Sequence, residues 1–181
     1  MDRYKASRDT NERDSSPPQR AGFPRYQEMT GPGTTPLFVD TGAFFAHFVR
    51  DSPRHERARI VMNGIQTGDL RFRPLYTTGY VLSELATLVL RKKSHEKALE
   101  TLRRIRNSSA ITVLHPDETQ FDAICDEFAR FDDQQISFVD HATGSLAAAY
   151  GVEHVFAFDS DFRTLGFTLV PDDVGISQSD H

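Results

Sequence analysis

Several classes of protein are excluded by what this sequence has little of. It contains one cysteine, Cys125, in 181 residues, so neither an intramolecular disulfide nor a cysteine-ligated zinc site is available. No apolar run approaches the about 20 residues that cross a bilayer, and the N-terminal stretch lacks the apolar segment of a signal peptide. We therefore expect a cytoplasmic protein without a membrane partner. The apolar spacing around Cys125 favours a buried thiol over a reactive one.

Positive charge is also in deficit. The net charge is −5, so the basic character typical of nucleic-acid-binding domains is absent, and any such function must rest on a local patch. The clearest basic patch outside the N-terminal stretch lies between residues 91 and 106, where the candidates are Arg91, Lys92, Lys93, Arg103 and Arg104. The alternative is a solvated helical face on which these charges pair with Glu96 and Glu100.

The chain divides by composition into three parts. Residues 1–35 are polar, of mixed charge and rich in Pro and Gly, which predicts a disordered or loosely attached arm. That arm either contacts RNA or a partner protein, or is a passive tail. Residues 36–171 have the size of one ordinary domain, and residues 172–181 form a C-terminal tail.

Short strand-like runs alternate with helical patterns between residues 36 and 171. The expected strands are 36–40, 70–76, 110–115, 154–158 and 167–170, and the expected helices are 55–65, 78–93, 94–107, 118–131 and 137–151. Ser52 followed by Pro53, Asp117 with Gln120, and Ser137 are the expected helix starts. This alternation predicts an α/β fold, with a mostly parallel sheet covered by helices on both faces.

Two aspartates follow expected strands directly. Asp40 ends the apolar run LFVD, and Asp159 follows HVFAF. In open α/β sheets, ligands bind beyond the carboxyl ends of the strands, so both acids stand where such a site forms. Each also has a structural alternative, because Asp40 could cap a helix around residues 42–48 and Asp159 could cap the turn that follows it.

Two further acids interrupt apolar helical patterns. Glu84 lies between Leu82 and Leu85, and Asp140 lies three residues after Ser137. Glu84 could be an ordinary solvated residue, and Ser137 with Asp140 could be a capping box. Taken singly, such readings are at least as good as a functional one.

Taken together, Asp40, Glu84, Asp140 and Asp159 favour a metal site. Carboxylates gathered at one sheet edge repel by roughly 3 kcal/mol per pair at about 5 Å and an effective dielectric near 20, so either some are protonated or a cation neutralises them. Oxygen ligands without a His or Cys cluster point to Mg²⁺ or Mn²⁺. Such an ion supports hydrolysis of phosphodiester bonds.

The ordered set of motifs LFVDT, VLSELA, SFVDHA and FAFDSDF resembles the PIN domain family, and within it the VapC-type ribonuclease toxins. The resemblance spans about residues 36–171 and implies a three-layer α/β/α fold that cleaves RNA with Mg²⁺ or Mn²⁺. It makes Asp40, Glu84, Asp140 and Asp159 the catalytic and metal-binding acids, with Asp40 and Asp140 as the most direct ligands. Thr41, Ser137 and Asp161 are secondary site residues.

The resemblance also implies partners. A toxin of this type pairs with an antitoxin protein and commonly forms a homodimer, with RNA as the substrate. Two other interpretations stay open: an RNA-processing nuclease, and a non-catalytic module of PIN fold that binds RNA or protein. A phosphatase of the haloacid dehalogenase type is disfavoured because it needs a second aspartate where this chain has Gly42.

Overall fold

The computed structural model describes residues 33–131 and 135–176. The predicted N-terminal arm therefore lies almost wholly outside the described residues. Within them the chain forms five strands and seven helices. The strands are β1 (Thr35–Val39), β2 (Phe72–Thr78), β3 (Ile111–Leu114), β4 (His154–Phe156) and β5 (Thr168–Val170).

The five strands form one sheet in which every neighbouring pair is parallel, in the order β3-β2-β1-β4-β5. This confirms the predicted α/β class. The chain builds outward from β1 to β3 on one side, then crosses to place β4 and β5 on the other. The order reverses between β1 and β4, and this is the point at which such sheets leave a crevice for a ligand.

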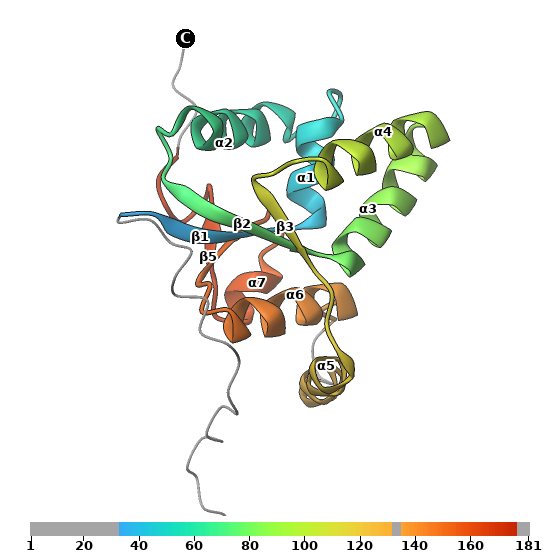
Figure 1. Ribbon diagram of the computed structural model, residues 1–181, viewed down its shortest axis with the longest axis vertical. Helices are drawn as coiled ribbons and strands as arrows, with labels where there is room; N and C mark the ends of the chain where they lie inside the picture. The colour runs from blue at the N-terminus through green and yellow to red at the C-terminus, as the bar shows by residue number, and fades with distance from the viewer. Residues whose placement is uncertain (1–32, 132–134, 177–181) are drawn as a thin grey trace, which may run out of the picture.

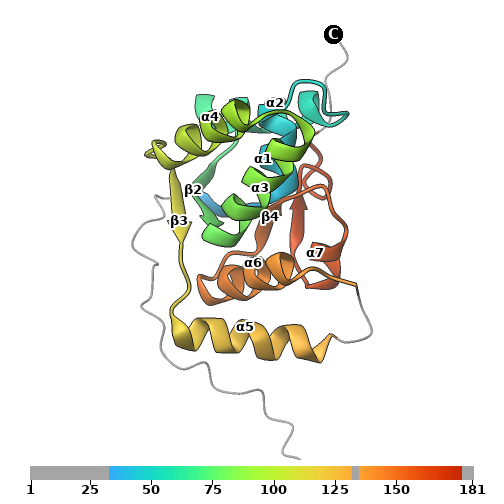
Figure 2. The same ribbon diagram turned by 90° about the vertical axis from the view of Figure 1, so that its right-hand side faces the viewer.

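Seven helices cover the sheet in two layers (Figure 1). One layer holds α1 (Thr41–Phe48), α2 (His55–Thr67), α3 (Gly79–Lys92) and α4 (His95–Arg106). The other holds α5 (Glu118–Arg130), α6 (Phe138–Ala149) and α7 (Asp161–Thr164), with α5 running beside α6 on its outer side (Figure 2). Over the described ranges, no helix is long and apolar enough to cross a bilayer.

Alternation along β1 explains why both faces need helices. Leu37 and Val39 pack into the core cluster under α1–α4, whereas Phe38 packs into the second cluster with residues of α6. All three are fully buried. A strand that is buried on both faces has a continuous run of apolar residues, here Leu37 to Val39. Asp40 follows this run directly, where the strand ends.

Two of the three helix starts that the sequence predicts are confirmed. Asp117 with Gln120 and Ser137 with Asp140 each form a capping box, at α5 and α6. The expectation for Ser52 and Pro53 is wrong: α2 begins at His55, and its N-cap residue Arg54 makes no side-chain capping bond. Ser52 is used in the preceding turn instead, where its carbonyl accepts the His55 N–H at 2.9 Å and its hydroxyl accepts the Arg54 N–H at 3.4 Å.

Candidate functional site

A cavity of about 390 Å³ lies beyond the carboxyl ends of β1 and β4. All four predicted acids line it, together with Thr41, Ser137 and Asp161 from the secondary set. The remaining lining residues are Gly42, Arg54, Leu88, Gln135 and Phe158. The fold thus brings together side chains that lie up to about 120 positions apart in the sequence, at the crevice that the strand order leaves open.

Asp40 is the most buried of these acids, with 6% of its surface exposed. Its Oδ2 caps α1 by accepting the Gly42 N–H at 2.9 Å, while its Oδ1 is buried without a hydrogen-bond partner among the described residues. Burial raises the pKa of Asp40 to about 7, and the charges of Asp140 and Glu84 add to that effect. A buried carboxylate oxygen with no donor needs either a proton or a cation.

Glu84 reaches the cavity from the second turn of α3. Its Oε2 accepts the hydroxyl proton of Thr41 at 2.6 Å, a bond that joins α1 to α3 across 43 residues of sequence. The side chain is otherwise exposed to solvent. Glu84 is therefore both accessible and fixed at one oxygen, which its interpretation as an ordinary solvated residue does not explain.

Asp140 has two partners on one neighbouring residue. Its Oδ2 accepts the Ser137 hydroxyl at 2.7 Å and the Ser137 N–H at 3.3 Å, and its own N–H donates to Ser137 Oγ at 3.2 Å. The capping-box interpretation is therefore confirmed. Even so, burial raises the pKa of Asp140, and the charges of Glu84 and Asp159 add to the rise. The capping role does not remove the crowding of negative charge.

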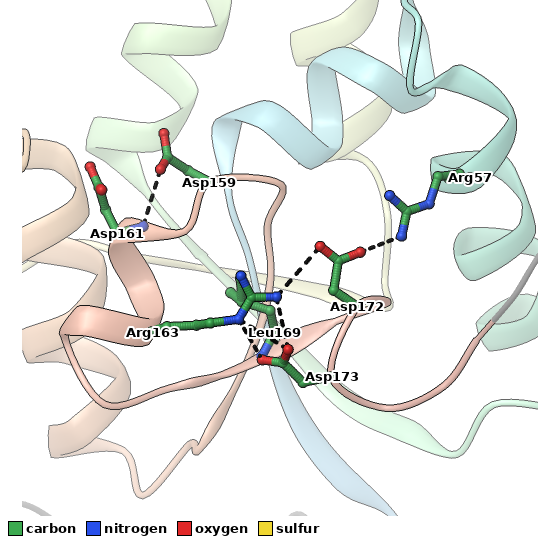
Figure 3. A network of polar contacts seen from close by, with 7 residues as sticks. All are labelled: Arg57, Asp159, Asp161, Arg163, Leu169, Asp172 and Asp173. Atoms are coloured by element: carbon green, nitrogen blue, oxygen red, sulfur yellow. Dashed lines mark hydrogen bonds and ion pairs between the residues drawn. The ribbon is translucent and has the colours of Figure 1, made fainter.

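Asp159 and Asp161 enter from the turn between β4 and α7 (Figure 3). Asp159 Oδ1 accepts the Asp161 N–H at 3.1 Å, which is the predicted capping of this turn. Burial and the Asp159 carboxylate together raise the pKa of Asp161. Asp40, Asp140 and Asp159 thus each serve a local backbone role while facing the same cavity.

The donor set fits a hard divalent cation in its chemistry. Five carboxylates supply only oxygen, and Asp40 contributes a buried oxygen with no hydrogen-bond donor. As they stand, no three His, Cys, Asp or Glu side chains of residues 33–131 and 135–176 are arranged to hold an ion. Binding would therefore require these side chains to rearrange, while the Thr41 and Ser137 hydroxyls each donate to one oxygen of Glu84 and of Asp140.

Sequence reasoning missed the basic residue of this cavity. Arg54 is its only Arg or Lys among the described residues. Its guanidinium lies over the Phe158 ring, 5.2 Å from the centroid. Arg54 occupies the N-cap position of α2, where no helical pattern or motif distinguishes it from the arginines around it, so no sequence signal was available.

A second ionic cluster lies below α7, and we call it the C-terminal network (Figure 3). Arg163 donates to both carboxylate oxygens of Asp173, at 2.8–3.2 Å, and Asp173 also accepts the Leu169 N–H at 2.8 Å. Asp172 forms ion pairs with Arg57 and, at 3.6 Å, with Arg163. Residues 172 and 173 of the expected C-terminal tail are thus tied to the domain, and Val174 and Ile176 pack against its core.

The predicted basic patch lies away from the acidic cavity. Lys93 and Arg104 line a larger cavity of about 950 Å³ between the end of α1 and the α3–α4 turn. There Lys93 pairs with Asp51, and Arg104 pairs with Glu100 at 3.6 Å. Arg91, Lys92 and Arg103 are exposed. Both interpretations of the patch stay open, although the pairing with Glu100 is what the solvated-face alternative predicted.

Cys125 is half-buried in α5, so its thiol is less enclosed than its apolar spacing suggested.

Comparison with known proteins places these observations in a family. The model of the PIN domain matches residues 37–168. The 23S rRNA-specific endonuclease VapC20 of Mycobacterium tuberculosis is 31% identical over 136 residues, which make up 74% of this chain and 97% of that protein. A crystal structure of VapC20 from the same organism, described as a sarcin-ricin loop cleaving toxin, superposes with a TM-score of 0.66 at 28% identity, covering 73% of this chain and 96% of that one.

A more distant structure shows the fold alone. VapBC2 from Rickettsia felis, bound to a DNA fragment from its promoter, matches with a TM-score of 0.57 at 12% identity. The match covers 75% of this chain and 97% of that one.

Proposed function

The chain belongs to the PIN domain family, and on that premise we propose that it is a divalent-metal-dependent endoribonuclease that acts as the toxin of a toxin–antitoxin pair. The observation that carries the proposal is the cavity at the β1–β4 crevice. Five carboxylates line it with a single basic residue, and the most buried of them has an oxygen without a donor. Crowded carboxylates repel one another, and a bound cation would relieve that repulsion while leaving the acids ionised.

Asp40 and Asp140 would be the direct ligands of Mg²⁺ or Mn²⁺, as the resemblance to the PIN family implies. Both are partly or fully buried at the cavity, and burial raises the pKa of each. Glu84 and Asp159, the two exposed acids, would complete the site. When bound, the ion would polarise the scissile phosphate and lower the pKa of the attacking water.

The chain's own residues have separable tasks. Asp40, with a pKa of about 7, must release its proton for the site to become fully anionic. Thr41 orients Glu84 through one oxygen and leaves the other free to accept a proton from water. Ser137 holds Asp140 in a similar way, so each hydroxyl keeps a carboxylate at the cavity before substrate arrives. The proposed reaction needs no side-chain nucleophile, because water attacks the phosphate.

RNA is the proposed substrate, and a ribosomal RNA loop is the first candidate because the relative with 31% identity is a 23S rRNA-specific endonuclease. An antitoxin protein is the proposed partner, because this chain covers nearly the whole length of VapC20, whose crystal structure is described as that of a toxin. An RNA-processing role would use the same chemistry on another RNA.

The alternative from another class is a non-catalytic module of PIN fold. Such a module has no need of four acids facing one cavity, and all four are present here. That observation favours catalysis.

The test is cleavage of RNA by the purified protein with Mg²⁺ or Mn²⁺, with EDTA, and in the Asp40→Asn variant. We expect EDTA to stop cleavage and Asp40→Asn to lower its rate by at least about 100-fold, because a buried ligand is lost. Asp51→Asn is the matched control, since Asp51 is an exposed acid that pairs with Lys93 outside the cavity. Cleavage that survives both EDTA and Asp40→Asn would rule out the metal mechanism.

A further inference from the structure

Arg54, the arginine that lines the acidic cavity, differs in its partners from the arginines near it. Arg57 and Arg163 are ion-paired to Asp172 and Asp173. Arg54 makes no ion pair with any carboxylate of the described residues, although five of them line the cavity that it lines. Its side chain is exposed, so an anion from outside could reach it.

Arg54 is held where it is by an aromatic surface. Its guanidinium carbon lies 5.2 Å from the centroid of the Phe158 ring. Phe158 is 8% exposed and packs at 5.8 Å against Phe156 of β4. Arg57 also lies over the Phe158 ring, at 5.6 Å, and is fixed by its ion pair with Asp172. The ring that supports Arg54 is therefore itself well anchored.

The Arg54 guanidinium lies over the Phe158 ring and donates no hydrogen bond to an acceptor of the described residues. Its N–H groups are therefore available to a ligand, because a cation–π contact does not use them as hydrogen-bond donors. The planar fork of these groups matches two oxygens of a phosphate. A lysine in the same place would supply charge but neither the fork nor the stacking.

We propose that Arg54 is a substrate-binding residue that contacts a backbone phosphate of the RNA at the acidic cavity. The inference rests on the proposed nuclease function and adds to it the group that receives the phosphate. The cavity carries five carboxylates, which repel a polyanion, and Arg54 is the one basic group among its described lining residues that opposes this repulsion. Phe158 is then the positioning residue for Arg54.

A purely structural role for Arg54 is the competing account. In that case its charge would only offset the nearby carboxylates, and its loss would change the stability and the metal affinity of the free protein. A substrate-binding role instead changes KM and the salt dependence of cleavage, with the melting temperature and the Mg²⁺ dependence little affected.

The experiment compares wild type, Arg54→Ala, Arg54→Lys and Arg71→Ala in cleavage of a short single-stranded RNA at several KCl concentrations. Arg71→Ala is matched in charge: Arg71 is exposed just before β2, and its carbonyl accepts the Thr35 N–H at the amino ends of β1 and β2, whereas the cavity lies beyond the carboxyl ends of the strands. We expect Arg54→Ala to lower kcat/KM by about 10- to 100-fold, mainly through KM, as loss of a charged hydrogen bond does. Arg54→Lys should recover part of this.

The salt dependence provides the independent readout. Losing one phosphate contact should reduce the slope of log kcat/KM against log salt by about 0.7 for a single strand. Arg71→Ala should leave the slope and kcat/KM close to wild type. Melting temperatures of all four proteins, measured with and without Mg²⁺, confirm that each is folded and binds the ion.

The proposal is overturned if Arg54→Ala cleaves like Arg71→Ala, with an unchanged salt slope, or if its defect is matched by a loss of melting temperature or Mg²⁺ binding. Both results require wild type to cleave RNA with Mg²⁺ and Asp40→Asn to fail. If wild type itself does not cleave, the nuclease function fails first, and this outcome is distinct from a failure of Arg54 alone.

Discussion

Two acidic clusters lie on either side of α7, and the chain treats them in opposite ways. In the C-terminal network, Asp172 and Asp173 are paired with Arg57 and Arg163. Among the described lining residues of the cavity, five carboxylates accompany one arginine, which forms an ion pair with none of them. Figure 3 shows the C-terminal network together with two of the cavity acids, Asp159 and Asp161, on the upper turn.

The pKa values separate the two clusters. The Arg163 guanidinium lowers the pKa of Asp173, with help from the Leu169 N–H. Burial raises the pKa of Asp40, Asp140 and Asp161, and the neighbouring carboxylates add to each rise. Acids of the first kind contribute to folding with partners from the same chain. Acids of the second kind have no ion pair with an Arg or Lys of the described residues, and this is the physical difference between the structural cluster and the candidate site.

Removing one cavity acid should have the largest effect on activity. We expect Glu84→Gln and Asp140→Asn each to lower kcat/KM by roughly 100-fold or more, because each takes a charge from the proposed metal site. Asp173→Asn should change kcat/KM by less than about threefold. Steady-state cleavage assays decide the matter, and similar losses in all three variants would erase the distinction between the clusters.

The two clusters should also respond to pH with opposite sign. In metal-free protein, Asp40 has a folded pKa of about 7 against an ordinary value of 3.8, so the folded state binds its proton more tightly than the unfolded chain. Its contribution to stability is present below about pH 4 and is lost as pH rises to 7, by up to about 4 kcal/mol. Asp173, with a lowered pKa, loses its contribution as pH falls.

Urea unfolding in EDTA at pH 4.5 to 8 measures this effect. Asp40→Asn has no proton to release at this position, so the variant should lose stability less steeply over that range. An identical pH slope in wild type and Asp40→Asn would show that Asp40 is not the group being titrated.

Binding of Mg²⁺ or Mn²⁺ should raise the free energy of unfolding of the wild-type protein. An ion that binds only the folded state contributes about 2.7 kcal/mol at 100 times its Kd. Because Asp40 must be deprotonated, the rise in Tm should be greater at pH 8 than at pH 6. Thermal melts of wild type and Asp40→Asn test this, and a metal-dependent rise that persists in Asp40→Asn would place the ion elsewhere.

The smallest effect is expected from the C-terminal network. Asp173→Asn should lower Tm slightly, because an exposed ion pair is weak but the hydrogen bond to the Leu169 N–H is weakened with it. High salt should narrow the difference from wild type, since it screens the Arg163 pair. A salt-independent difference would mean that packing, and not charge, carries the effect.

The sequence predicted the fold, and the four acids that it singled out line one cavity, because the strands, the helices and the positions of these acids depend on local patterns. The buried run that ends at Asp40 and the Ser137–Asp140 spacing specify an element and a site residue at once. Arg54 could not be predicted, since its relation to Phe158 exists only after residues 104 positions apart are folded together. The expectation for Ser52 and Pro53 is wrong because the carbonyl and hydroxyl of Ser52 accept backbone N–H groups in the turn that precedes α2.

The same holds for the C-terminal segment. Asp172 and Asp173 look like polar tail residues in the sequence, and their partners Arg57 and Arg163 come from α2 and α7. Long-range pairing of this kind leaves no periodicity to detect.

Three of the cavity acids accept backbone N–H groups at the start of a helix or turn, Asp40 for α1, Asp140 for α6 and Asp159 for the turn into α7. The choice of substitution at these three aspartates therefore matters for a catalytically inactive variant that is meant to bind RNA without cleaving it. Alanine would remove both the carboxylate and the acceptor for a backbone N–H group. Loss of cleavage could then result from a destabilised helix start or turn and not from the loss of a catalytic group. Asparagine keeps an oxygen for the backbone and removes only the negative charge.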